Sequence, residues 1–192
     1  MDPLLWGPCI WKTLFSISFN CTATDVIQVK QLLKLLEKVI PCPTCRTHYK
    51  VNREKSDNLY PLKNQENIYK WLWHTKTLIN KHLKIKNTEL KYIKMRYETF
   101  SHDICDTELC DILVLISLTV KNEDVGKFHE FIFALGNLIR FIRGRLPALL
   151  QCVENVKPST ILLVTNIVRK EQGMNTRELK HYENVLDASK IL

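Results

Sequence analysis

Glycine and proline are scarce in this chain, with 5 and 7 copies among 192 residues, and this composition leaves little room for long disordered loops. The 7 cysteines are too few and too unevenly spaced for the disulfide scaffold of a small secreted protein. Uncharged apolar runs are short as well: the longest, residues 112–120, is about half of what a membrane-spanning helix needs. Residues 1–11 lack a positive stretch followed by an apolar core. We therefore expect no signal peptide, no membrane span and a cytoplasmic location.

Charge of one sign is concentrated in the first half of the chain. Residues 1–104 hold 17 Lys and Arg against 9 Asp and Glu, whereas residues 105–192 hold 11 of each, so the whole net charge of +8 belongs to the first half. This asymmetry predicts two units, 1–104 and 105–192. The lysines of the first unit are dispersed rather than clustered, so we expect no nucleic-acid partner.

The hydrophobic spacing is helical throughout, and no segment alternates with a period of two for long enough to predict a sheet. In the first unit we expect a helix opening near Pro8, one over residues 26–40, one from the Cys42 region to about Asn52 with a polar loop at 53–61, one from the cap Asn64 to Leu83, and a short one over 88–100. In the second unit we expect helices over residues 109–120, 125–143, 147–156, 159–170 and 175–189. The fold class is therefore all-α: a four-helix bundle with a short fifth helix, plus a C-terminal all-helical domain.

The most reactive pattern in the chain is Cys42-Pro43-Thr44-Cys45. Pro43 suits the first turn of a helix, where unpaired N–H groups, the helix dipole and the charge of Arg46 would stabilise a thiolate. Three interpretations stay open: two buried small hydrophobes, a zinc knuckle with His48, or a redox pair. A closed zinc site needs a fourth ligand, and a thioredoxin-like fold needs a preceding strand where this chain has a helix.

Three motifs follow one another over residues 6 to about 97: Trp6-Gly7-Pro8 with Trp11 and Leu14; Cys42-Pro43-Thr44-Cys45 with Arg46, His48 and Tyr49; and Trp71-Leu72 with Ile79, Asn80 and Leu83. In this order and spacing they resemble the Erv/ALR family of FAD-linked sulfhydryl oxidases. The resemblance implies that the first unit binds FAD, that Cys45 passes electrons to it, and that Cys42 exchanges with an incoming thiol. The FAD-binding residues expected from it are Trp6, Trp11, Phe15, His48, Tyr49, Trp71, Lys76, Ile79, Asn80, Leu83 and Lys84.

The resemblance also implies partners: a dithiol protein substrate, directly or through a thioredoxin-like carrier, dioxygen as the final acceptor yielding hydrogen peroxide, and a second copy in a homodimer. No metal is expected. The chain departs from the family pattern at Phe15, where many members have histidine, at Lys76 and Thr77, where the pattern has His-Asn, and at Trp73, which replaces a structural cysteine. We expect Lys76 to compensate near the FAD pyrophosphate, with Lys81 or Lys84. Such reduced motifs are similar to those of large DNA virus members, which would make this a late viral protein of the host cytoplasm or virion.

Two questions remain open after the resemblance. Cys105 and Cys110 could form a second, electron-shuttling pair, but an i, i+5 pair in a regular helix cannot close, so the shuttle requires a helix break; the alternative is that both are buried or incidental. The rival function, from a different class, is a non-catalytic helical interaction protein whose Cys-x-x-Cys is structural or binds zinc. The sequence assigns no role to residues 105–192.

Overall fold

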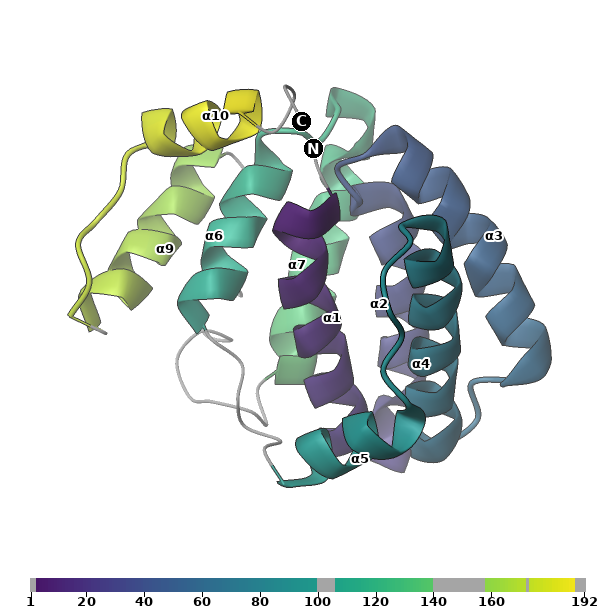
Figure 1. Cartoon of the computed structure of the whole chain (residues 1–192). Coiled ribbons are helices and arrows are strands. Elements are labelled where there is room, and N and C mark those ends of the chain that lie inside the picture. Colours follow the sequence, from purple (N-terminus) through teal and green to yellow (C-terminus); the bar gives the residue numbers. More distant parts are fainter. Residues whose placement is uncertain (1–2, 100–105, 140–157, 172, 189–192) are drawn as a thin grey trace.

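The computed structural model describes residues 3–99, 106–139, 158–171 and 173–188, and every element in these ranges is helical (Figure 1). The all-α prediction is therefore confirmed. Within the described ranges, no helix is both long and apolar enough to cross a membrane.

The first half is a bundle of four helices closed at one end by a short fifth. These are α1 (Pro3–Asn20), α2 (Val26–Val39), α3 (Pro43–Leu59), α4 (Gln65–His82) and α5 (Leu90–Thr99), with the 3₁₀ turn η1 (Ala23–Asp25) between the first two. Helix α4 packs against both α1 and α3, and α5 lies across the end of α1. The bundle and its short fifth helix are as predicted.

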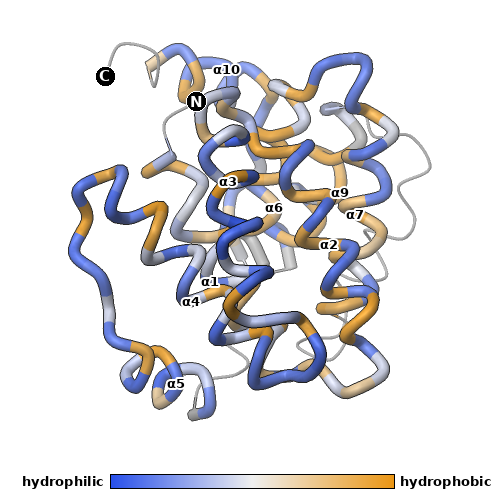
Figure 2. The backbone as a smooth tube through the Cα atoms, turned by 90° about the vertical axis from the view of Figure 1, so that its right-hand side faces the viewer, coloured by the Kyte–Doolittle hydropathy of each residue, from blue (hydrophilic) through white to orange (hydrophobic). Residues whose placement is uncertain are grey.

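The second half packs on the bundle through two of its helices. It contains α6 (Asp106–Ser117), the 3₁₀ turn η2 (Asn122–Asp124), α7 (Val125–Ile139), α9 (Pro158–Glu171) and α10 (Leu179–Ala188). Helix α7 lies along α2, and α6 lies between α1 and α9. Figure 2 shows why: α6 and α7 are largely hydrophobic, whereas α3 is largely hydrophilic. One cluster of buried apolar side chains runs through both halves. The boundary at residues 104 and 105 stays a prediction, and the helix expected at 147–156 lies outside the described residues.

Local signals explain where several helices begin and which face they bury. Asn64 caps α4 as predicted, with its Oδ1 accepting from the N–H of Asn67 at 2.8 Å. On α2, the side chains of Leu32, Leu33 and Val39 are at most 1% exposed, so the predicted apolar stripe is the buried one. Ile27 of the same helix is apolar but lies outside this stripe, and its side chain is 76% exposed.

Two predicted helix boundaries are wrong. Helix α1 begins at Pro3 and contains Pro8, so Pro3 rather than Pro8 occupies the opening turn. Helix α3 continues to Leu59, through residues predicted to form a loop. Those residues are polar, but they are paired: Arg53 binds Asp57 at 2.9 Å and Glu37 of α2 at 3.3 Å. The ion pairs let a polar sequence continue as a helix.

Candidate redox site

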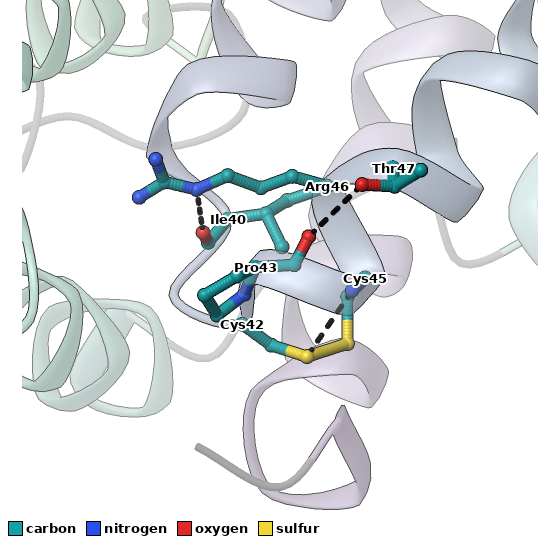
Figure 3. The surroundings of a disulfide bond; sticks show 6 residues. All are labelled: Ile40, Cys42, Pro43, Cys45, Arg46 and Thr47. Atoms are coloured by element: carbon teal, nitrogen blue, oxygen red, sulfur yellow. Dashed lines mark hydrogen bonds between the residues drawn. A yellow bond between two sulfur atoms is a disulfide. The ribbon is translucent and has the colours of Figure 1, made fainter.

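Cys42 and Cys45 form a disulfide at the start of α3, with their Cα atoms 5.1 Å apart (Figure 3). Cys42 is the N-cap residue and Pro43 is the first helical residue, as the sequence predicts. The N–H of Cys45 donates to Cys42 Sγ at 3.2 Å, so one of the unpaired amides of the helix start already points at sulfur. Both cysteines are half-buried. The pair is thus at the positive end of a helix and within reach of solvent.

The geometry does not favour a metal knuckle. Each sulfur of the pair is bonded to the other, so neither is available as a thiolate ligand in this state. Elsewhere in the described part of the chain, no three His, Cys, Asp or Glu side chains gather as a metal site would require. His48 instead stacks on His82, with ring centroids 4.8 Å apart.

Arg46 does not have the position expected from its sequence neighbourhood. Its Nε donates to the carbonyl of Ile40 at 2.6 Å, and its Nη1 donates to Asp124 Oδ2 at 2.8 Å. Figure 3 shows the guanidinium on the Ile40 side of the helix and the two sulfurs on the other. The guanidinium that was expected to stabilise a thiolate is thus paired with an acid from the second half, and its effect on the thiolates stays a prediction.

A cavity of about 320 Å³ opens beside the disulfide, walled by α1, α2, α3 and α4. Its volume falls within the range of about 300–1,000 Å³ of ordinary ligand pockets. Cys45 lines this cavity and Cys42 does not. The two cysteines therefore differ in one respect: both are half-buried, but only Cys45 contributes to the mostly apolar wall of the cavity.

Nine residues predicted from the sequence line the cavity together: Trp6, Trp11, Cys45, His48, Tyr49, Lys76, Ile79, Asn80 and Leu83. They come from α1, α3, α4 and the residue following α4, and so from all three sequence motifs. Tyr49 is 1% exposed, and its hydroxyl donates to the carbonyl of Leu33 at 2.9 Å. Burial raises the pKa of Tyr49 far above its usual range, so this phenol is a neutral anchor between α3 and α2.

Three predicted residues lie elsewhere. Phe15 is 2% exposed and stacks on Tyr97, at 5.4 Å between ring centroids. Trp71 is fully buried, and its Nε1 donates to Asp57 at 2.8 Å. Lys84 is exposed with a positive φ of 56°, in the turn after α4. None of the three is among the residues that line the cavity, and their role in binding a cofactor stays a prediction.

Sequence reasoning missed other parts of the cavity wall: Pro3, Leu4, Gly7, Pro8, Ile10, Leu36, Ile40, His82 and Ile85. His82 follows Ile79 by three residues on α4, so helical spacing places the two on one face. That spacing could have identified His82. Leu36 lies on α2 and Ile40 directly follows that helix, where the sequence signals only a core face.

Two polar features of the cavity wall lack partners. Trp6 is 7% exposed, and its Nε1 has no hydrogen-bond partner among the described residues. Lys76 forms no ion pair with another described residue, and its partial burial lowers its pKa below the ordinary value. An unused donor and a cation without an ion-pair partner, in a cavity whose wall includes Trp6 and Trp11, fit a flat ligand that carries acceptor atoms and negative charge. FAD has both properties.

The structure describes one member of the second predicted cysteine pair, Cys110. Cys105 lies outside the described residues. Cys110 is 1% exposed within α6, and its carbonyl accepts a hydrogen bond from Thr165 Oγ1 at 3.4 Å. The shuttle between Cys105 and Cys110 stays a prediction.

Comparison with protein families gives one match: residues 8–98 fit the model of the Erv1 / Alr family. No curated protein and no solved structure matches the chain. The matched segment includes the disulfide and most of the cavity wall. It ends at α5, so α6 to α10 lie outside it.

Proposed function

We propose, on the premise that residues 8–98 match the model of the Erv1 / Alr family, that this protein is an FAD-dependent thiol oxidase. It would make disulfide bonds in protein substrates, passing electrons through Cys42 and Cys45 to FAD and then to dioxygen. The observation that carries the proposal is the position of Cys45, which joins a disulfide at a helix start to an aromatic-walled cavity.

The first step is thiol–disulfide exchange at Cys42. A substrate thiolate attacks Cys42 Sγ, the sulfur outside the cavity, and the Cys42–Cys45 bond breaks. Cys45 leaves as a thiolate at the positive end of α3, which stabilises it. The second substrate thiol then releases the substrate as a disulfide, so that two electrons and two protons are transferred to the pair.

The cavity residues position the second step. Trp6 and Trp11 would form apolar walls for a flat ring next to Cys45, and the Trp6 Nε1–H would donate to an acceptor on it. Bound there, FAD supplies two-electron acceptance from a thiolate and reoxidation by dioxygen, with hydrogen peroxide as product. Lys76 would bind negative charge, as at a pyrophosphate, and this matches its position where the family pattern has histidine.

Purified protein tests this proposal directly. It should be yellow, contain stoichiometric FAD, and consume oxygen with dithiothreitol while releasing peroxide. A colourless preparation with stoichiometric zinc and no oxygen uptake would reverse the assignment in favour of a non-catalytic interaction protein.

The partners of the proposed oxidase follow from the family premise. We propose that the protein forms a homodimer, which a measurement of its molar mass in solution by light scattering tests. We also propose that a thioredoxin-like carrier is the immediate dithiol donor. The carrier is tested by trapping a mixed disulfide with Cys42 in a Cys45→Ser variant. A trapped adduct at any other cysteine would contradict the exchange role of Cys42.

A further inference from the structure

Arg46 connects three segments that meet at the redox disulfide. Its backbone N–H donates to the carbonyl of Cys42 at 2.9 Å within the first turn of α3. Its Nε donates to the carbonyl of Ile40, the residue that ends α2, at 2.6 Å. Its Nη1 donates to Asp124 at 2.8 Å. The guanidinium therefore fixes the short connection from Ile40 to Cys42 while its outer end is held by a carboxylate.

Asp124 comes from the second half of the chain, outside the segment matched by the family model. It is the last residue of η2, directly before α7, and α7 lies along α2. Because α2 leads into the disulfide, the packing of α7 on α2 brings Asp124 to the start of α3. The side chains of Arg46 and Asp124 are 21% and 16% exposed, so water screens this ion pair less than it screens a surface pair.

We propose that Asp124 is a positioning residue for the Cys42–Cys45 pair: it holds the Arg46 guanidinium against Ile40 and away from the sulfurs, and so keeps the disulfide difficult to reduce. The inference rests on the proposed function for its purpose, since a pair that must be reoxidised after every turnover benefits from a low potential. It assigns a role to the second half of the chain, which contributes a carboxylate to the redox site.

The expected direction follows from the charges. Reduction of the pair takes up two electrons and up to two protons, and any thiolate formed carries negative charge next to the start of α3. A neutralised guanidinium stabilises that charge little, whereas a free one stabilises it through space. Removal of the Asp124 charge should therefore favour the reduced, dithiol form.

The test measures the thiol–disulfide equilibrium of Cys42–Cys45 in glutathione buffers, using the full chain and mass spectrometry of alkylated peptides. Asp124→Asn should make the pair easier to reduce by about three- to tenfold, which is about 15–30 mV. Glu123→Gln is the matched control, because Glu123 is the adjacent acid, its side chain is 75% exposed, and it pairs with Lys121. That control should change the equilibrium by less than about 1.5-fold. Asp124→Glu, which keeps the charge, should stay closer to the wild type than Asp124→Asn.

A double-mutant cycle decides whether Asp124 acts through Arg46. In an Arg46→Met background, Asp124→Asn should shift the equilibrium by less than about twofold. The proposal is overturned if Asp124→Asn behaves like Glu123→Gln, or if its shift is the same with and without Arg46. Should Asp124→Asn fail to fold, Arg46→Lys is measured instead: a lysine keeps the charge but lacks the fork that bonds Ile40 and Asp124 together, so it should also ease reduction, and an unchanged equilibrium overturns the proposal. None of these measurements needs flavin or oxygen, so a failed oxidase assay leaves their outcome readable.

Discussion

Ser56 Oγ and His74 Nδ1 lie 2.9 Å apart, between α3 and α4, and Thr75 Oγ1 donates to the same hydroxyl at 2.7 Å. The Ser56 hydroxyl donates its own hydrogen to the carbonyl of Asn52 at 3.0 Å. With that hydrogen committed, Ser56 accepts from both neighbours, which requires the proton of His74 to be on Nδ1. One hydroxyl thus joins the helix of the disulfide to the helix that carries Lys76, Ile79 and Asn80 of the cavity wall.

Replacement of Ser56 by alanine should destabilise the fold by about 1–3 kcal/mol, because Thr75 and His74 lose a buried acceptor. Urea unfolding measures the change. Thr47→Ala is the matched control: Thr47 also donates to the carbonyl four residues earlier, at 3.4 Å, but it is exposed. Equal losses for the two variants would show that the buried network contributes nothing.

His74 should make stability depend on pH. Burial lowers the pKa of His74 below 6.5, so the unfolded chain binds more protons between the folded-state pKa and 6.5. The free energy of unfolding should therefore rise with pH across that window, and the penalty is complete below the folded-state pKa. His74→Gln should flatten this rise, whereas His129→Gln, at an exposed position on α7, should not. A slope that survives His74→Gln would assign the effect to another group.

Lys76 should destabilise the ligand-free protein at neutral pH. Burial lowers the pKa of Lys76 below 10.5 in the folded protein, so the charged form destabilises the fold, and this penalty is complete below the folded-state pKa. Between the folded-state pKa and 10.5 the unfolded chain binds more protons, so the free energy of unfolding should rise with pH across that window. Lys76→Met should stabilise the flavin-free chain at pH 7, with the gain fading toward pH 10.5, and should weaken FAD binding. Exposed Lys81→Met should do neither. Unchanged FAD affinity in Lys76→Met would remove Lys76 from the cofactor site.

Trp6 should contribute a specific hydrogen bond to FAD. Trp6→Phe keeps an aromatic wall but removes the unpartnered Nε1–H, so FAD affinity should fall about three- to tenfold, the value of one hydrogen bond. The control is Trp73→Phe, since Trp73 Nε1 donates to the carbonyl of Thr88 at 3.0 Å and Trp73 does not line the cavity. Fluorescence titration of FAD into flavin-free protein measures both. Equal affinities for both variants and the wild type would contradict a donor role for Trp6.

Several helices of the fold could be predicted from local sequence patterns. The period of apolar residues predicted α2, Asn64 predicted the start of α4, and Pro43 predicted the helix start at the disulfide. The extension of α3 to Leu59 could not be predicted in this way, because it depends on partners such as Glu37 that lie far away in sequence. Helix propensity depends on the residues of one segment, so it takes no account of ion pairs between helices.

The residues of the candidate site could be predicted where they belong to the sequence motifs. They could not be predicted where packing of distant segments brings them to the site. Cys45, Trp11 and Asn80 line one cavity, as their shared motifs imply. Arg46 is different: sequence proximity suggested only that its charge would stabilise a thiolate, whereas packing of the second half brings Asp124 to it. Because Arg46 and Asp124 are 78 residues apart in the sequence, no local pattern predicts their ion pair.

The most direct test of the central claim is anaerobic reduction of bound FAD by dithiothreitol, followed by visible absorbance in the wild type, Cys42→Ser and Cys45→Ser. If Cys45 is the sulfur next to the flavin, the wild type should bleach rapidly, and both variants should bind FAD and remain yellow on the same timescale. Bleaching of Cys45→Ser at the wild-type rate would contradict the account.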